Sequence, residues 1–210
     1  MSIGLILFFI APAAAYRREA IRHLKTLFPD KFEQIWRATN TWQNRLATNR
    51  PRYSGGVKVV MMYMEWSCAL YRALQDYRMN QAEAILLVET IMSDVYQPVP
   101  AAMFKLSRLR SAKRETRVKW LLGMITEHVL PAPPFCYRHL PSETGVAFDV
   151  TFCPIADYFK SQGVPELTEP AGGNLDYVMA REWGIELVRT QTLAEGAAYC
   201  DFRWKCPANG

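Results

Sequence analysis

Apolar residues recur at helical spacing in the N-terminal part of the chain. A first stripe runs from Ala20 to Phe28 and a second from Phe32 to Thr39, and Pro29 lies between them. Each stripe predicts an amphipathic helix, and the proline predicts the break between the two. After a further break at 49–56, residues 57–77 are apolar nearly all round. This is typical of a helix buried at the centre of a domain.

Capping residues and prolines set the limits of the helices that follow. Asn80 has the side chain of an N-cap, and Glu83 follows three residues later, an arrangement typical of a capping box. The Pro98-Val99-Pro100 segment is expected to end this helix. One or two more helices are predicted between residues 105 and 129, and the proline cluster at 131–134 should close the helical region.

Beyond the proline cluster, apolar and polar residues alternate with period two, which is typical of strands. The candidate strands are residues 145–152, 184–192 and 197–205. The last two are expected to pair antiparallel through a turn at 194–196, and residues 163–173, rich in Gly and Pro, predict a loop. We therefore expect an α+β fold, with an N-terminal helical bundle packed on a small C-terminal antiparallel sheet. Residues 1–130 and 131–210 should form one integrated domain.

Cys153 lies where the first of these strands is expected to end and a helix to begin. Pro154 suits the first position of that helix, and Ile155, Tyr158 and Phe159 follow at helical spacing. A thiol at the N-cap is close to the positive end of the helix dipole and to unpaired N–H groups, which should lower the pKa of Cys153. Cys153 is a candidate nucleophile or metal ligand, although a free cysteine more often serves as a small buried apolar side chain.

Further polar residues gather around the predicted strand ends. Each has an ordinary role as a cap, a turn residue or part of a surface ion pair, and their common location makes them candidate site residues. They are Asp149, Asp157, Asn174, Asp176, Arg189, Thr192, Glu195, Cys200, Asp201 and Arg203.

Length and composition indicate a globular protein. A chain of 210 residues with 50% hydrophobic content can bury a sizeable core. Its five cysteines form no Cys-x-x-Cys pair, so neither a disulfide framework nor a zinc ribbon is indicated. Reduced thiols in a cytoplasmic protein are the simplest explanation. The sequence specifies no oligomeric state.

The positive charge of the chain, +5 overall, is concentrated in one segment. Residues 105–119 hold seven Lys and Arg side chains against the single acid Glu115, a pattern that suits either an anionic partner or a solvated helix face. No zinc finger or RNP signature accompanies it, so a nucleic-acid partner is not expected. Residues 1–15 are mostly apolar but too short to span a bilayer. We expect them to be core or to touch a membrane together with 105–119, and a cleaved signal or weak anchor is the alternative.

Three segments near the C-terminus resemble one known family: TFCPIADYFKSQGVPEL, LDYVMA and VRTQTLAEGAAYCDFRW. Over residues 150–204 the order of a Cys-Pro, an Asp, a Thr-x-x-x-Gly turn and a Cys-Asp-Phe-Arg is similar to that of the L-2-amino-thiazoline-4-carboxylic acid hydrolase family. The resemblance implies hydrolytic opening of a small cyclic amidine-like substrate at a C–N bond, with no cofactor.

The resemblance also implies roles for the candidate residues. A thiolate at Cys153 or Cys200 would attack the amidine carbon. The acids that could move protons are Asp157, Asp176, Glu195 and Asp201. Arg203 or Arg189 would pair with a substrate carboxylate through a bidentate fork. The other expected substrate-binding residues are Asp201, Thr192 and Asn174.

Several alternatives stay open. Cys153 and Cys200 could instead bind zinc, with an acid or His139 as a further ligand. Many members of the family carry a cysteine three residues before the acid that matches Asp176, where this chain has Gly173. If that cysteine is the nucleophile or a ligand in the family, this chain either acts on a different substrate or by a different reaction, such as a rearrangement or isomerisation, or it retains only binding. A non-catalytic membrane-binding protein and a thiol redox protein with a Cys153–Cys200 disulfide are the rival hypotheses.

Overall fold

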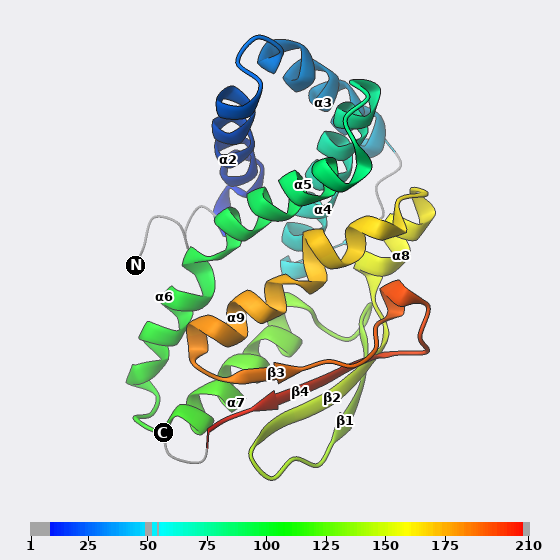
Figure 1. The fold of residues 1–210 in the computed structure, drawn as a ribbon. Helices are drawn as coiled ribbons and strands as arrows, with labels where there is room; N and C mark the ends of the chain where they lie inside the picture. The colour runs from blue at the N-terminus through cyan, green and yellow to red at the C-terminus, as the bar shows by residue number, and fades with distance from the viewer. Residues whose placement is uncertain (1–8, 49–51, 54, 208–210) are drawn as a thin grey trace.

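Helices form the first part of the chain and a sheet the last part, as Figure 1 shows. The computed structural model describes residues 9–48, 52–53 and 55–207. The helices are α2 (Pro12–Leu27), α3 (Phe32–Ala47), α4 (Gly55–Asp76), α5 (Gln81–Tyr96), α6 (Pro98–Leu106), α7 (Arg114–Met124), α8 (Pro154–Ser161) and α9 (Leu175–Trp183). The strands are β1 (Cys136–Leu140), β2 (Gly145–Phe152), β3 (Glu186–Val188) and β4 (Cys200–Lys205). The fold is α+β, as expected.

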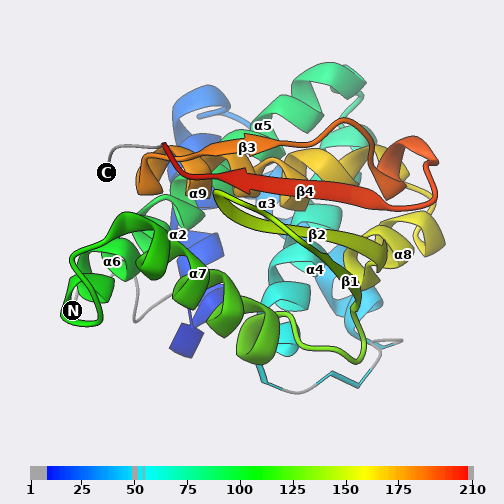
Figure 2. The ribbon, with the colours of Figure 1, turned by 90° about the horizontal axis from the view of Figure 1, so that it is seen from below.

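The strands are ordered β1-β2-β4-β3, and each neighbouring pair is antiparallel. In the central pair, Phe148 lies opposite Phe202 and Val150 lies opposite Cys200. Because successive side chains of a strand point to opposite faces, these four residues share one face of the sheet. They belong to the buried core, and α4, α5 and α9 lie behind the sheet in Figure 2.

The helical region is organised around α4, whose side chains are buried along most of its length. Trp66 of α4 stacks on Trp36 of α3, with ring centres 5.8 Å apart, and on Tyr16 of α2 at 6.1 Å. These aromatic contacts connect three helices in one layer. The prediction of a central buried helix over 57–77 is confirmed.

Local capping signals were reliable guides to the ends of helices. The Asn80 side chain accepts a hydrogen bond of 2.8 Å from the Ala82 N–H at the start of α5. Cys153 is the N-cap of α8, and Pro154 lies in its first turn. Pro98 follows the end of α5 as predicted, and it also begins α6, because proline fits the first turn of a helix.

Three segments differ from the sequence-based expectation. Strand β1 was not predicted, because it lies at the sheet edge and its side chains do not alternate between buried and exposed. The loop predicted over 163–173 contains a π-helical turn, η4 (Glu169–Gly173), packed against α5. Helix α9 was also missed. In each case the segment is too short for periodicity to be decisive, and for η4 and α9 part of the packing is against helices far away in sequence, namely α5 and α6.

The basic segment 105–119 divides into structural and solvent-exposed cations. Arg117 is buried, stacks 3.7 Å from the Phe104 ring centre and donates to the Phe104 carbonyl. Lys119 pairs with Glu115 at 2.7 Å, and Arg114 donates to the Gly184 carbonyl. The remaining exposed cations form no ion pair with a described residue: Lys105, Arg108, Arg110 and Lys113. Residues 1–8 of the apolar N-terminal segment lie outside the described residues, and within the described ranges no helix is long and apolar enough to cross a bilayer.

Gly56 permits the close contact between α4 and a second π-helical turn, η2 (Ile125–Val129). A Cβ atom at position 56 would lie 2.6 Å from the Val129 carbonyl oxygen and 2.7 Å from that of His128. Because these are backbone atoms, they can move away only if the turn shifts. We expect Gly56→Ala to lower the free energy of unfolding by roughly 1–3 kcal/mol, measured by urea denaturation.

Gly123 of α7 provides the matched control, because a Cβ atom there meets nothing within 4 Å. Gly123→Ala should raise the free energy of unfolding by about 0.5–1 kcal/mol, since alanine is the better helix former. Equal effects of the two substitutions would contradict the close approach at Gly56.

Candidate active site

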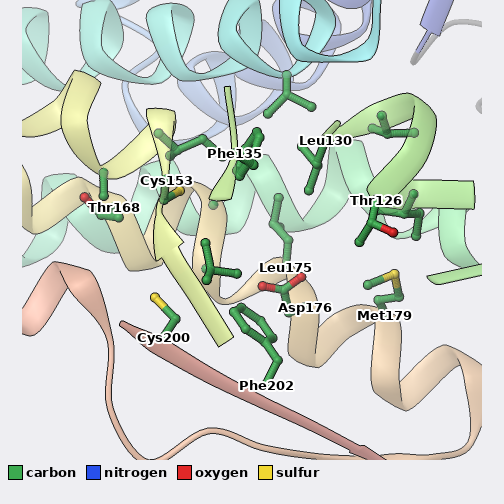
Figure 3. Close-up of a pocket in the computed structure, with 18 of the residues that line it drawn as sticks. Thr126, Leu130, Phe135, Cys153, Thr168, Leu175, Asp176, Met179, Cys200 and Phe202 are labelled. Carbon is green, nitrogen blue, oxygen red and sulfur yellow. The ribbon is translucent and has the colours of Figure 1, made fainter. Parts of the chain in front are cut away.

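A cavity of about 170 Å³ lies between the apolar face of the sheet and the helices that cover it. Phe148, Val150 and Phe202 form the sheet side, and α4, α5, α6, α7, η2 and α9 contribute further apolar side chains. The charged and sulfur-bearing residues of its wall are Cys153, Glu169, Asp176, Arg189 and Cys200, together with the methionines. Figure 3 shows Cys153 and Cys200 on one side of Asp176 and Met179 on the other. The cavity therefore has a polar end and an apolar end.

Cys153 reaches the polar end from the start of α8. Burial raises the pKa of its thiol to about 12, although the backbone N–H groups of Ala156 and Ile155 act in the opposite direction. The expectation of a lowered pKa is therefore wrong. The helix start is where the sequence places it, but loss of hydration outweighs the effect of the helix N-terminus. The resting thiol is neutral.

Cys200 faces the same cavity from the first position of β4. The Leu193 N–H lies 3.2 Å from its Sγ and donates a hydrogen bond to it. Burial raises the pKa of this thiol as well, and the nearby carboxylates of Glu169 and Asp176 act in the same direction. Both cysteines are free thiols that line one cavity.

Arg189 is the buried cation of the site. Its side chain is only 4% exposed and forms an ion pair with Glu169. Nη1 of Arg189 lies 3.6 Å from a carboxylate oxygen of Asp176 and donates to the Gly173 carbonyl at 3.2 Å. Phe202 contributes its ring face 5.4 Å from the guanidinium. One arginine thus holds two carboxylates from η4 and α9 in the cavity wall.

Asp176 combines burial with an intermediate pKa. Burial raises its pKa to about 7, the Arg189 guanidinium lowers it, and the Glu169 carboxylate raises it. Burial also raises the pKa of Glu169, against the influence of Arg189. A carboxyl group that is half ionised near neutral pH is suited to accept and return a proton.

Three buried polar atoms of cavity-lining residues have no hydrogen-bond partner among the described residues, namely Nε of Arg189, Oγ1 of Thr168 and Nε1 of Trp204. Buried donors are rarely left unpaired, so each one needs an explanation such as a water molecule or a ligand. All three residues belong to the lining of the cavity.

The structure separates Arg203 and Asp201 from this cavity. They alternate with Cys200 and Phe202 along β4 and therefore lie on the other face of the sheet. Arg203 donates to Asp149 at 2.8 Å, and Asp201 accepts from the Thr190 and Gln191 N–H groups, both at 2.8 Å. Burial by itself would raise the pKa of Asp149, but Arg138 and Arg203 hold it below its usual range.

Four more of the sequence-derived candidates lie outside the cavity lining. Asp157 is exposed on the first turn of α8. Asn174 donates to Glu89 of α5 at 2.6 Å. Thr192 is the N-cap of η5 (Leu193–Glu195) and accepts from the N–H of Glu195, whose side chain is exposed. In this structure Asn174 and Thr192 support the backbone beside the site.

Glu169 is the site residue that sequence reasoning missed. It was placed in a loop, whereas the π-helical turn η4 directs its carboxylate toward Arg189. A Cβ atom at Gly173 would lie 2.9 Å from one Glu169 carboxylate oxygen and closer still to the other. The sequence signal that could have indicated Glu169 is the spacing of four residues between it and Gly173. Residues at this spacing are neighbours on a helical turn, and glycine leaves room for the side chain of the other. Glycine at 173 leaves the space that the carboxylate occupies.

Zinc ligation would require a third ligand beside the two thiols. In the part of the chain that the structure describes, no three His, Cys, Asp or Glu side chains are grouped so that they could hold a metal ion. His139, the histidine considered as a ligand, lies on β1 and stacks with Tyr137 at 6.2 Å between ring centres.

Comparison with known protein families extends the resemblance well beyond the C-terminal motifs. Residues 61–204 match the L-2-amino-thiazoline-4-carboxylic acid hydrolase family. The match begins in α4 and ends in β4, so it includes every residue of the polar cavity end as well as the helices that cover it. Comparison with curated proteins and with solved structures gives no match. Since the matched region covers most of the sequence, the chain belongs to the L-2-amino-thiazoline-4-carboxylic acid hydrolase family.

Proposed function

We propose that the protein hydrolyses a C–N bond in a small cyclic amidine-like substrate, with Cys153 as the nucleophile and Asp176 as the group that moves protons. The observation that carries this proposal is a half-buried carboxyl group with a pKa of about 7 in the wall of the same cavity as two thiols. Membership of a hydrolase family supports the reaction class. The largely apolar walls of the cavity would limit the access of bulk water to a reacting substrate.

The neutral resting thiols explain why a base is needed. With the pKa of Cys153 near 12, only a negligible fraction is thiolate at neutral pH. The ionised Asp176 carboxylate, with a pKa of about 7, is a base in the wall of the same cavity. Cys153 is favoured over Cys200 because two N–H groups at its helix start, those of Ala156 and Ile155, stabilise negative charge on its sulfur, whereas Cys200 accepts from the N–H of Leu193.

The reaction can be written with all protons accounted for. Asp176 takes the thiol proton as the Cys153 sulfur bonds to the carbon of the protonated amidine ring. The ring C–N bond then breaks, and Asp176 returns the proton to the departing nitrogen. A water molecule adds to the same carbon, the bond from carbon to the enzyme sulfur breaks, and a proton from that water restores the thiol. The net change is addition of one water across the C–N bond.

Cysteine substitutions test the nucleophile. We expect Cys153→Ala to lower kcat/KM by at least about 100-fold, because the covalent step is lost. Turnover of a panel of 2-amino-thiazolines and related cyclic amidines would be followed by mass spectrometry. Cys136→Ala is the control, because this exposed thiol does not line the cavity. Full activity of Cys153→Ala would exclude the mechanism, and loss in Cys200→Ala alone would move the nucleophile to β4.

The pH dependence tests Asp176. Its basic form is the carboxylate, which is present above its pKa of about 7. We expect kcat/KM to fall about tenfold per pH unit below this value and to level off above it. Asp176→Asn should abolish this dependence and lower kcat/KM by about 100-fold or more. A flat profile between pH 5 and pH 9 would exclude Asp176 as the base.

Stability provides the control for that substitution. A carboxyl whose pKa is raised by folding stabilises the native state when protonated, and this contribution is lost as the pH rises through about 7. At pH 8, Asp176→Asn should therefore leave Tm unchanged or raise it. A large decrease in Tm would indicate a structural role.

We also propose a second function, reversible contact with an anionic membrane surface. Leu109 is 92% exposed between α6 and α7, and it lies between Arg108 and Arg110, which form no ion pair with a described residue. An exposed leucine flanked by two such cations suits the interface of a bilayer that contains acidic lipids.

Liposome co-sedimentation tests this contact. Binding to vesicles containing phosphatidylserine should fall at least about tenfold in an R108E/R110E variant, because two attractive charges become repulsive. The control, K160E/R181E, has the same net charge but changes exposed cations on α8 and α9. No binding by the wild-type protein at low salt, or equal loss in both variants, would contradict the proposal.

A further inference from the structure

The charge balance at the polar end of the cavity determines which substrate charge it can accept. Arg189 is the cation there, and two carboxylates already surround it, Glu169 in a direct ion pair and Asp176 at 3.6 Å. With both carboxylates ionised, these three side chains carry a net charge of −1. The exposed Glu195 adds negative potential, since it raises the pKa of Glu169.

An anionic substituent would therefore meet an occupied arginine. A ligand carboxylate next to Arg189 would lie beside one or both protein carboxylates and would have to displace one of them. Arg203, the other arginine considered for this role, binds Asp149 on the opposite face of the sheet. A cationic amidinium would instead face two carboxylates in a poorly hydrated site, where charge complementarity has a large effect.

Gly173 and Glu169 act together in producing this charge balance. A side chain at position 173 would force the Glu169 carboxylate to shift, because a Cβ atom there would lie 2.7 Å from the carboxylate carbon. Glycine therefore leaves the carboxylate in its observed position beside Arg189. Gly173, which stands where many family members have a cysteine, thus affects the position of a negative charge in the site.

The apolar end of the cavity does not offer a second site for charge. The Tyr137 hydroxyl donates to the Leu130 carbonyl at 2.6 Å, and Thr126 donates to the Leu122 carbonyl at 3.0 Å. The Tyr96 hydroxyl is directed to the sulfur of Met179 at 3.5 Å. These three polar groups already have partners within the protein, so the surface left for a ligand is mainly apolar and carries no charge, with the neutral Trp204 N–H as a further donor.

The size of the cavity suits a ligand of about one ring. Its volume of about 170 Å³ is close to the roughly 150 Å³ of an apolar protein cavity that holds benzene. The unpaired Arg189 Nε and Thr168 Oγ1 could donate to a neutral acceptor of such a ligand, such as a ring nitrogen or sulfur.

We propose that the substrate of this protein is a cationic amidine-type ring with an uncharged apolar substituent, and that Glu169 excludes carboxylate-bearing rings by occupying Arg189. This inference deepens the proposed hydrolysis and rests on it for the identity of the reacting group. It assigns Glu169 as a specificity-determining residue, made possible by Gly173.

Benzamidine and benzoate provide matched probes, because they share one ring and differ in the sign of the charge. Isothermal titration calorimetry at pH 8 should show benzamidine binding to the wild-type protein at least about tenfold more tightly than benzoate. The proposal would be overturned if benzoate bound as tightly as benzamidine. It would also be overturned if neither ligand bound.

Variants at position 169 test the assigned residue. Glu169→Gln removes one negative charge and frees the Arg189 guanidinium, so the ratio of benzamidine to benzoate affinity should fall at least about tenfold. Gly173→Ala displaces the Glu169 carboxylate without changing the charge of the protein, so the ratio of benzamidine to benzoate affinity should fall here as well. Gly173→Ala also remains informative if Glu169→Gln does not fold.

Glu195→Gln is the control, because it removes the same charge from an exposed neighbouring side chain. It should change the ratio less than about threefold, because solvent screens an exposed charge. The role of Glu169 would be overturned if the ratio of benzamidine to benzoate affinity stayed unchanged in both Glu169→Gln and Gly173→Ala. It would also be overturned if Glu195→Gln changed this ratio as much as Glu169→Gln does. Calorimetry measures binding without turnover, so the two proposals can fail separately. If only the hydrolytic mechanism failed, the protein would still prefer benzamidine to benzoate but would not hydrolyse cyclic amidines.

Discussion

The antiparallel pairing of β2 with β4 is the constraint on which the rest of the structure depends. Its register places Phe148 and Val150 beside Phe202 and Cys200 on the face that the helices cover. A shift by one residue would turn Asp149 into the core and remove Cys200 from the cavity, because side chains alternate between the two faces. The same register places Asp149 directly opposite Asp201 on the other face, where arginines and backbone N–H groups neutralise them.

Burial is the dominant electrostatic influence at the polar end of the cavity. At Cys153 it outweighs the helix N-terminus, and at Asp176 it outweighs the attraction of Arg189. The site consequently contains neutral thiols beside a carboxyl that titrates near neutrality. Such an arrangement costs stability and is typical of catalytic sites, where groups are held in protonation states that water would not favour.

The ion pairs of Arg189 connect this chemistry to the architecture. Arg189 follows β3, Glu169 belongs to η4, and Asp176 begins α9, so one guanidinium joins three elements around the cavity. Since Arg189 is only 4% exposed, its charge would be very unfavourable without these partners. The requirement to neutralise Arg189 therefore fixes both the geometry of the cavity wall and the charge that an incoming ligand encounters.

The sequence by itself determined the α+β class, the helices whose stripes are long enough to read, the strand 145–152, and the helix start at Cys153, because each depends on local periodicity or capping. Its motifs also indicated the family. The tertiary structure alone decided which candidates share a cavity. It brought Cys153, Cys200, Asp176 and Arg189 together, placed Arg203 and Asp201 on the opposite face, and added Glu169. Strand register and burial made this selection, because both arise from contacts between residues far apart in sequence and neither is written in local spacing.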